Sequence, residues 1–215
     1  MAASVLSWIV DNYFELSAAA LGFVAIYLQI RQNVWYWLVS IIMVSMYIYI
    51  YIDAKLYADM SLQVYYLVIS FYGWYLWLFG KSVNHHKTAI SVSLSSGKLK
   101  CILGGTALLL FLVIAWVLVQ FTNSDLPYWD SFTTSLSFVA TWMLARKKLE
   151  NWLIWIVVDA VSVGLYIYKE LYPTAVLFLF LTVLAYVGYL RWQKDMFKQR
   201  ATDWQFEHQS YDKAN

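Results

Sequence analysis

The sequence predicts an all-α membrane protein with seven transmembrane helices, its N-terminus outside the cell and its C-terminus in the cytoplasm. Of its 215 residues, 62% are apolar and 13% are charged, whereas an ordinary soluble domain is about half apolar and a quarter charged. Several stretches of about 16 to 20 residues carry no charge, which is long enough to cross a bilayer core of ~30 Å. Lipid must therefore surround most of the chain.

The helices are expected in a simple order. Residues 1–13 contain an apolar segment too short to span a membrane, which predicts a half-helix at the interface. Pro127 and Pro173 lie at the openings of the fifth and seventh spans, where a missing N–H costs no hydrogen bond. Residues 80–100 are polar and predict a surface loop, and the tail after Arg191 is expected to fray. The predicted spans are 14–30, 34–52, 58–79, 101–121, 129–145, 151–168 and 173–191.

The distribution of basic residues predicts the orientation. Of the 15 Lys and Arg residues, thirteen fall in segments that follow odd-numbered helices, and only Lys55 and Lys169 fall on the other side. Cytoplasmic loops carry the excess of basic residues, so the C-terminus is predicted to be cytoplasmic. A miscounted span would scramble this distribution, which therefore also supports seven helices.

The second and third helices resemble the sixth and seventh, which indicates an internal repeat. Gly73 aligns with Gly188 at an offset of 115 residues, and Trp37 aligns with Trp155 at 118 beyond a small gap. We expect parallel repeats in a 3+1+3 arrangement, which places a substrate site between the halves near the midplane. The expected segments are the half-helix at 1–13, a first repeat at 14–80, a cytoplasmic loop and linker helix at 81–127, a second repeat at 128–193 and a cytoplasmic tail at 194–215.

Polar and aromatic side chains share narrow helix faces in both halves. The largest group of polar and aromatic side chains lies on the sixth helix. At 100° per residue, its members fall on one face within an arc of about 80°. The third helix contributes Gln63 and Ser70 to such a face, where packing between helices is an equally good reason for them. The second helix contributes Trp37, and the fifth has a hydroxyl stripe with Ser137 beside it. The sixth-helix residues are Trp152, Trp155, Asp159, Ser162 and Tyr166, and the stripe is Ser131, Thr134 and Thr141.

Asp159 is the most informative of these residues. It lies roughly 12 Å along the axis of a helix that is otherwise uncharged. A carboxylate at that depth costs ~2.5–3.5 kcal/mol, so it should face protein or water and have a partner. No Lys or Arg lies inside any predicted span, since Arg191 stands at the very end of the last one. The partner is then a proton, a neutral donor or a cationic substrate, and an Asp that serves helix packing is the structural alternative.

Trp152 and Trp155 share the face of Asp159. Indole rings stack on flat rings and attract cations at ~0.5–2 kcal/mol each, although interfacial belts also use Trp. Two indoles and a carboxylate on one face predict a binding wall for a flat, cationic, aromatic ligand.

Other classes of function fit the sequence less well. A net charge of +2 is too small to indicate a surface that binds nucleic acid, and a single cysteine, Cys101, excludes a cysteine metal cluster. The last span has no lysine for a retinal Schiff base, and the spans hold no second embedded acid or His for a membrane protease. We therefore expect no enzyme activity and no cofactor. A membrane receptor or sensor that does not transport stays open.

Three runs of residues resemble the Pnu family of bacterial vitamin transporters over nearly the whole chain. The resemblance implies a SWEET-like 3+1+3 architecture, a bacterial inner-membrane location and assembly as a homotrimer. It also implies facilitated diffusion of a water-soluble vitamin, which intracellular phosphorylation then retains. The runs are Leu62-Gln63 with Tyr72-Gly73-Trp74-Tyr75-Leu76-Trp77, then Tyr128-Trp129-Asp130-Ser131, then Glu150-Asn151-Trp152-Leu153-Ile154-Trp155 with Asp159.

One departure from the family pattern bears on the substrate. The family signature for nicotinamide riboside is Trp-x-x-Trp-x-x-x-Asn, and the last position here is Asp159. An Asn amide both donates and accepts, as suits a carboxamide, whereas a carboxylate only accepts. Thiamine offers a donating amino group and a thiazolium cation. The residue therefore favours thiamine as substrate, with nicotinamide riboside as the alternative.

Overall fold

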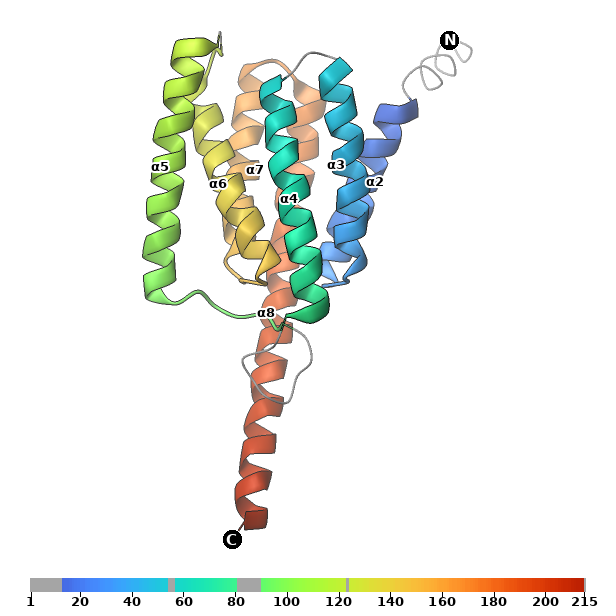
Figure 1. Ribbon diagram of the computed structural model, residues 1–215, viewed down its shortest axis with the longest axis vertical. Helices are drawn as coiled ribbons and strands as arrows, with labels where there is room; N and C mark the ends of the chain where they lie inside the picture. Colours follow the sequence, from blue (N-terminus) through green and yellow to red (C-terminus); the bar gives the residue numbers. More distant parts are fainter. Residues whose placement is uncertain (1–12, 54–56, 81–89, 123, 215) are drawn as a thin grey trace. The chain divides into compact units, whose positions relative to one another are not determined.

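The computed structural model consists of helices, as the sequence predicts (Figure 1). The structure describes residues 13–53, 57–80, 90–122 and 124–214, and the predicted half-helix at 1–13 lies almost wholly outside them. Seven helices are present in the described part of the chain, and no strand is named there. They are α2 (Tyr13–Ile30), α3 (Trp35–Asp53), α4 (Tyr57–Phe79), α5 (Gly97–Phe121), α6 (Pro127–Ala145), α7 (Asn151–Tyr168) and α8 (Tyr172–Ala214).

Over the residues that the structure describes, five helices are long and apolar enough to cross a membrane, namely α3, α4, α5, α7 and α8. In α2 the continuous apolar stretch within the described side chains is Ser17–Ile30. The hydroxyl residues of α6 lower its hydropathy, but nine of its 19 residues are buried. A helix that neighbouring helices shield from lipid does not need an apolar surface all round.

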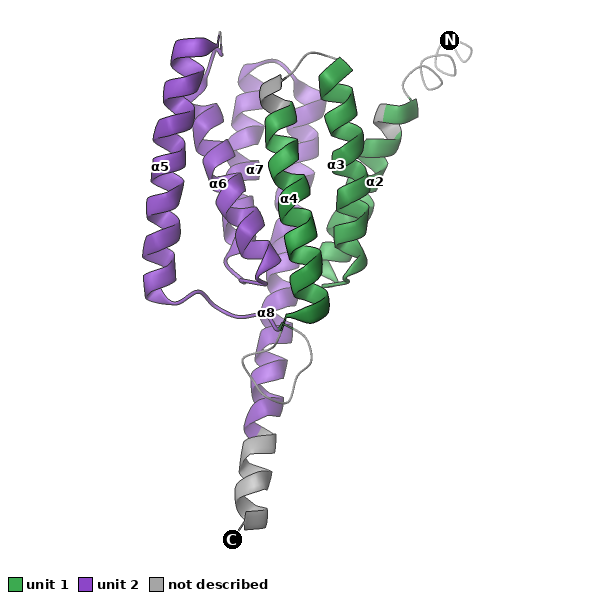
Figure 2. Ribbon diagram, viewed as in Figure 1, with its two compact units in different colours: residues 1–90 green, residues 91–215 purple. Residues whose placement is uncertain are grey.

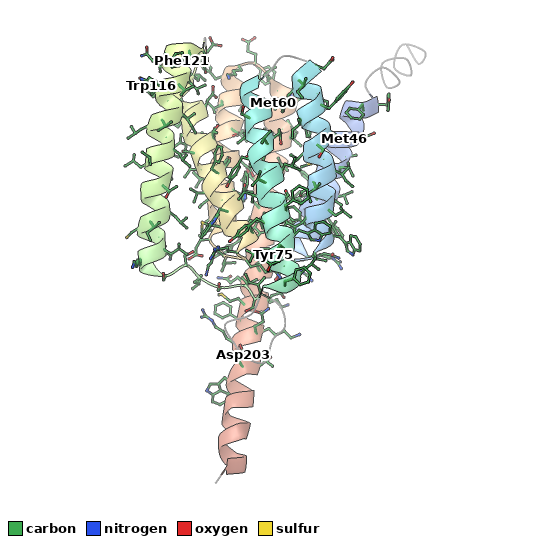
Figure 3. The ribbon with its side chains drawn as sticks, viewed as in Figure 1. Met46, Met60, Tyr75, Trp116, Phe121 and Asp203 are labelled. Carbon is green, nitrogen blue, oxygen red and sulfur yellow. The ribbon has the colours of Figure 1, made fainter. Side chains whose placement is uncertain are left out.

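The chain forms two compact units, residues 1–90 and 91–215 (Figure 2). In the first unit, α3 packs against both α2 and α4. In the second, α5, α6 and α7 each pack against the next helix along the chain. Trp116 and Phe121 are 60% and 70% exposed, and they project from one end of α5 (Figure 3). Such aromatic side chains near a helix end are typical of a membrane interface.

Three helices end in the same kind of turn, with a non-glycine residue in the left-handed region. These residues are Gln32 after α2, Lys147 after α6 and Glu170 after α7, with φ of 54°, 48° and 59°. In each turn the next residue donates its N–H to a carbonyl five residues earlier, as Lys148 does to Met143 at 2.9 Å. This hydrogen bond satisfies a carbonyl at the helix end.

The prediction of a frayed tail after Arg191 is wrong. α8 is 43 residues long and continues to Ala214, which at 1.5 Å per residue is about 65 Å. Its second part, which carries Asp203, extends beyond the ends of α5, α6 and α7 (Figure 3). Trp192 and Met196 are 0% and 4% exposed, so helical packing continues past the predicted end of the last span.

Candidate functional site

Helix α7 carries all five residues of the predicted polar and aromatic face. Asp159 is 6% exposed, and Ser162, one turn further along, is also 6% exposed. Trp155 and Tyr166 are half-buried, and Tyr166 stacks on Phe178 of α8 with a 5.0 Å separation of ring centroids. The structure therefore buries the predicted polar face of α7.

Asp159 makes no hydrogen bond or ion pair with the described residues. Ser162 donates its hydroxyl to the carbonyl of Val158 at 2.8 Å and so leaves the carboxylate unengaged. Among the described residues, no group of three His, Cys, Asp or Glu side chains could hold a metal ion. A buried carboxylate without a protein partner is the chemistry expected of a group that meets a ligand or a proton.

Trp155 offers a second unused polar group one turn before Asp159. Its indole Nε1 is buried and has no hydrogen-bond partner in the part of the chain that the structure describes. Residues four apart on a helix are neighbours on its surface, so α7 presents a donor and an acceptor side by side. This donor and acceptor pair, Trp155 and Asp159, is the centre of the candidate site.

Trp152 has a different role from Trp155. It is 1% exposed and lies edge-on to Trp192 of α8, with ring centroids 5.5 Å apart at 88°. A Cβ built on Gly188 would lie 2.6 Å from the Trp152 ring. The indole thus fills the contact between α7 and α8, and this geometry gives no support to the prediction that it stacks on a ligand.

Trp37 occupies the same kind of contact in the first unit. It is 0% exposed and lies edge-on to Trp77, with ring centroids 5.4 Å apart at 88°. A Cβ on Gly73 would collide with the Trp37 ring. These contacts match Trp37 to Trp152, at the offset of 115 that also relates the two glycines, and not to Trp155 as the alignment predicts.

Ser70 and Gln63 both lie on α4. Ser70 is 4% exposed and donates its hydroxyl to the carbonyl of Tyr66 at 2.7 Å. Gln63 is half-buried. Ser70 is therefore engaged with its own helix.

The turn between α6 and α7 is fastened to residues 91–96, which the sequence predicts as a surface loop. Ser93 N donates to Lys147 O at 3.1 Å, and Leu149 N donates to Ser93 O at 3.0 Å. Ser95 N donates to both carboxylate oxygens of Glu150, at 3.0 and 3.1 Å. Lys100 Nζ lies 3.2 Å from Glu150 Oε1. The segment before α5 is thus bound to the start of α7.

Charge and burial compete at this turn. Burial lowers the pKa of Lys147, which is 8% exposed, to about 8. The pKa of Lys148 is also lowered, chiefly by burial and partly by Arg146, while Glu150 acts in the opposite direction. Lys148 Nζ donates to Ser93 Oγ at 2.9 Å.

Sequence reasoning gave no role to Asn151, which is fully buried at the first position of α7. Its Nδ2 donates to Lys148 O at 2.6 Å, while its Oδ1 has no partner among the described residues. The sequence feature that could have singled out Asn151 is its place in the run Glu150-Asn151-Trp152, which carries the family resemblance.

Residues 12–194 match the sequence model of a family described as nicotinamide mononucleotide transporter. The chain belongs to this family. The match covers most of the chain and includes all the residues of the candidate site, so the resemblance to the Pnu vitamin transporters is confirmed. The protein is a multi-pass protein of the bacterial inner membrane.

The curated relatives bear on the substrate. The chain is 25% identical to the nicotinamide riboside transporter PnuC of Escherichia coli (strain K12), over 87% of this chain and 85% of that one. It is 23% identical to the nicotinamide riboside transporter PnuC of Neisseria mucosa, over 86% of this chain and 73% of that one. Both relatives are named as nicotinamide riboside transporters.

A solved structure shares the fold. The crystal structure of the vitamin B3 transporter PnuC superposes with a TM-score of 0.69 and covers 91% of this chain and 87% of that one. Its sequence identity to this chain is 21%. This likeness places the helices in the PnuC fold.

Proposed function

We propose that this protein transports nicotinamide riboside across the inner membrane and that Trp155 and Asp159 contact the nicotinamide group. The observation that carries the proposal is that two neighbouring polar groups of α7, Trp155 Nε1 and the Asp159 carboxylate, have no partner among the described residues. A primary carboxamide has a carbonyl oxygen that accepts and an NH₂ that donates. The Trp155 indole supplies the donor and the Asp159 carboxylate supplies the acceptor.

The donor on Trp155 removes the main objection to this substrate. A carboxylate alone cannot donate to a carboxamide, which is why Asp159 by itself favours thiamine. With Trp155 Nε1 beside it, the pair offers the same two functions as an Asn side chain. Thiamine is the second candidate, because its amino group and its cation both suit a carboxylate.

Calorimetric titration of the purified protein with nicotinamide riboside, thiamine and riboflavin tests the assignment. We expect binding of nicotinamide riboside and no binding of riboflavin. Tighter binding of thiamine than of nicotinamide riboside would reverse the order of the two candidates. Absence of binding for all three would remove the vitamin assignment.

The mode of transport follows from the small number of embedded charges. With Asp159 as the one acid in the middle of a predicted span, we infer facilitated diffusion, with phosphorylation inside the cell retaining the vitamin. Uptake into substrate-free vesicles should stop at equal concentrations inside and outside. Accumulation that a protonophore abolishes would make Asp159 a proton carrier, and binding without any uptake would favour a receptor.

The proposed topology is a 3+1+3 arrangement of parallel repeats with the C-terminus in the cytoplasm. The offset of 115 residues relates the Trp and Gly contacts of the two units and also the turns at Gln32 and Lys147, and the charge bias supports the orientation. A fluorescent protein fused after Asn215 should be bright. A dark but stably expressed fusion would contradict the orientation. Assembly as a homotrimer stays a prediction from the family resemblance.

A further inference from the structure

Helix α6 carries a ladder of three hydroxyl groups, Thr133, Ser137 and Thr141, which we call the hydroxyl ladder. Each donates to the carbonyl oxygen four residues earlier, at 3.1, 2.8 and 2.8 Å. Ser137 and Thr141 are each 7% exposed. Ser137 and Thr141 are therefore buried, Thr133 is half-buried, and the hydroxyl hydrogens of all three are occupied within their own helix.

A hydroxyl oxygen that has donated its hydrogen still has lone pairs. The ladder consequently offers acceptors and no free donors. Such a surface suits a ligand group that donates, and a sugar hydroxyl is one. An apolar side chain would suit contact with another helix equally well.

The first unit shows that the position does not require hydroxyl groups. The counterparts of Thr133, Ser137 and Thr141, 115 residues earlier on α2, are Ala18, Gly22 and Ile26. The helices that carry them have matching ends, since α2 ends at Ile30 and α6 at Ala145. Ala25 and Ala140 also correspond at this offset, and they are 3% and 0% exposed.

The counterparts of the α7 pair differ from it as well. Ser40 and Val44 of α3 stand at the positions that correspond to Trp155 and Asp159. Ser40 is polar, but Val44 has no acceptor in place of the Asp159 carboxylate. Packing common to the two units therefore does not account for the carboxylate of α7 or for the hydroxyl groups of α6.

The ladder and the α7 pair lie at matching depths. α6 and α7 pack against each other and are joined by the short turn at 146–150. Ser137 lies eight residues before the end of α6, and Asp159 lies eight residues after the start of α7. At 1.5 Å per residue both are about 12 Å from the turn, and Thr141 and Trp155 are both about 6 Å from it.

We propose that Ser137 and Thr141 accept hydrogen bonds from the ribose hydroxyls of the nucleoside whose base meets Trp155 and Asp159. The inference rests on the proposed function and extends it from the base to the sugar. It makes the two hydroxyl residues determinants of specificity for a nucleoside over a vitamin that lacks a sugar.

A cycle of protein and ligand changes tests this contact. Thr141→Val and Ser137→Ala remove an acceptor with little change in shape, and Thr141→Ser keeps it. The ligands are nicotinamide riboside and its 2′-deoxy and 3′-deoxy analogues, measured by calorimetry. Thr182→Val is the matched control, because Thr182 of α8 makes the same bond to its own helix, to Phe178 O at 2.8 Å.

Each hydroxyl-deleting variant should bind nicotinamide riboside about threefold to tenfold more weakly, the range expected for one hydrogen bond. One deoxy analogue should bind wild type more weakly than nicotinamide riboside does, by a similar factor. The variant that lacks the matching hydroxyl should bind this analogue as weakly as it binds nicotinamide riboside, because the effects of removing both sides of one direct contact do not add. Thr141→Ser and Thr182→Val should match wild type.

Unchanged affinity in both Thr141→Val and Ser137→Ala would overturn the inference, and so would losses that add independently for every deoxy analogue. A correctly folded Thr141→Ser that binds as weakly as Thr141→Val would also overturn it for that residue. Wild-type protein that does not bind nicotinamide riboside would instead overturn the proposed function.

Discussion

The Trp152 ring lies where a side chain on Gly188 would stand. A Cβ atom at Gly188 would lie 2.6–2.7 Å from three carbon atoms of the indole. Real Cβ atoms do not approach other atoms this closely. The ring also meets Trp192 edge-on. Gly188 therefore fixes the distance between α7 and α8, and with it the position of the helix that carries Asp159.

Gly188→Ala should destabilise the protein, because an indole held on all sides cannot move aside. Overpacking of this kind costs about 1–3 kcal/mol. The thermal midpoint in detergent should fall, and Gly73→Ala should lower it similarly through Trp37. Gly164→Ala is the control, since a Cβ there would meet nothing within 4 Å. Equal midpoints for Gly188→Ala and Gly164→Ala would contradict the contact.

The two tryptophans of α7 should separate stability from binding. Trp152→Ala removes a fully buried ring and should cost about 3–5 kcal/mol of unfolding free energy. Trp155→Ala removes a half-buried ring and should leave the thermal midpoint nearer that of wild type while it weakens nicotinamide riboside binding. Measuring both quantities for both variants checks the division. A Trp155→Ala protein with wild-type affinity would exclude Trp155 as a ligand contact.

The helix ends could be predicted because their signals are local. Charge-free stretches, prolines and basic turns place six of the seven helix C-termini within one residue of those observed, from α2 at Ile30 to α7 at Tyr168. Two boundaries depend on other forces. α5 begins four residues earlier than predicted, where Ser96 caps it by accepting from Leu99 N at 3.3 Å. α8 continues because packing at Trp192 and Met196 extends the helix into its polar part.

The site was predicted only in part, because helical periodicity shows which residues share a face but not what covers it. It placed Trp152, Trp155 and Asp159 together, yet it could not show that Gly188 admits the ring of Trp152. The fastening of Ser95 to Glu150 was also unpredictable, since it joins residues 55 apart through a backbone N–H.

Lys147 predicts a pH dependence of stability. Burial lowers its pKa from 10.5 to about 8 in the folded protein. Between these values the unfolded chain binds more protons, so the free energy of unfolding should rise with pH from about 8 to about 10.5 through this group. Below pH 8 the buried charge is a constant cost, which Lys147→Met removes.

Thermal midpoints measured from pH 7 to pH 10 should therefore show Lys147→Met above wild type at pH 7, with the difference shrinking as pH rises. Because methionine also has a β-carbon, the left-handed backbone conformation at φ 48° is as strained in the variant as in wild type. Lys98→Met, at an exposed position, is the control. A difference that is constant over this range would assign the effect to packing instead of charge.

Glu150 should control the order of residues 91–96. Glu150→Ala removes the acceptor of the Ser95 N–H, so hydrogen exchange of that amide should speed up by about tenfold or more, as for loss of a charge-assisted bond. Lys100→Ala is the matched control, because it deletes only an ion pair whose lysine is 58% exposed. Such pairs contribute ~0–1 kcal/mol. Equal exchange in wild type and Glu150→Ala would show that the bridge at Ser93 suffices.

Asp159 should discriminate between the two candidate vitamins when its charge is removed. Asp159→Asn keeps an acceptor oxygen, so nicotinamide riboside binding should hold or improve, because the amide can still accept from a carboxamide NH₂. Thiamine loses a charge-assisted contact of roughly 1.5–3 kcal/mol, which is about tenfold to a hundredfold or more in affinity. Asp159→Leu removes every acceptor, and both ligands should bind less tightly. Calorimetry on the three proteins decides: a fall in nicotinamide riboside affinity as large in Asp159→Asn as in Asp159→Leu would show that an amide oxygen cannot replace the carboxylate.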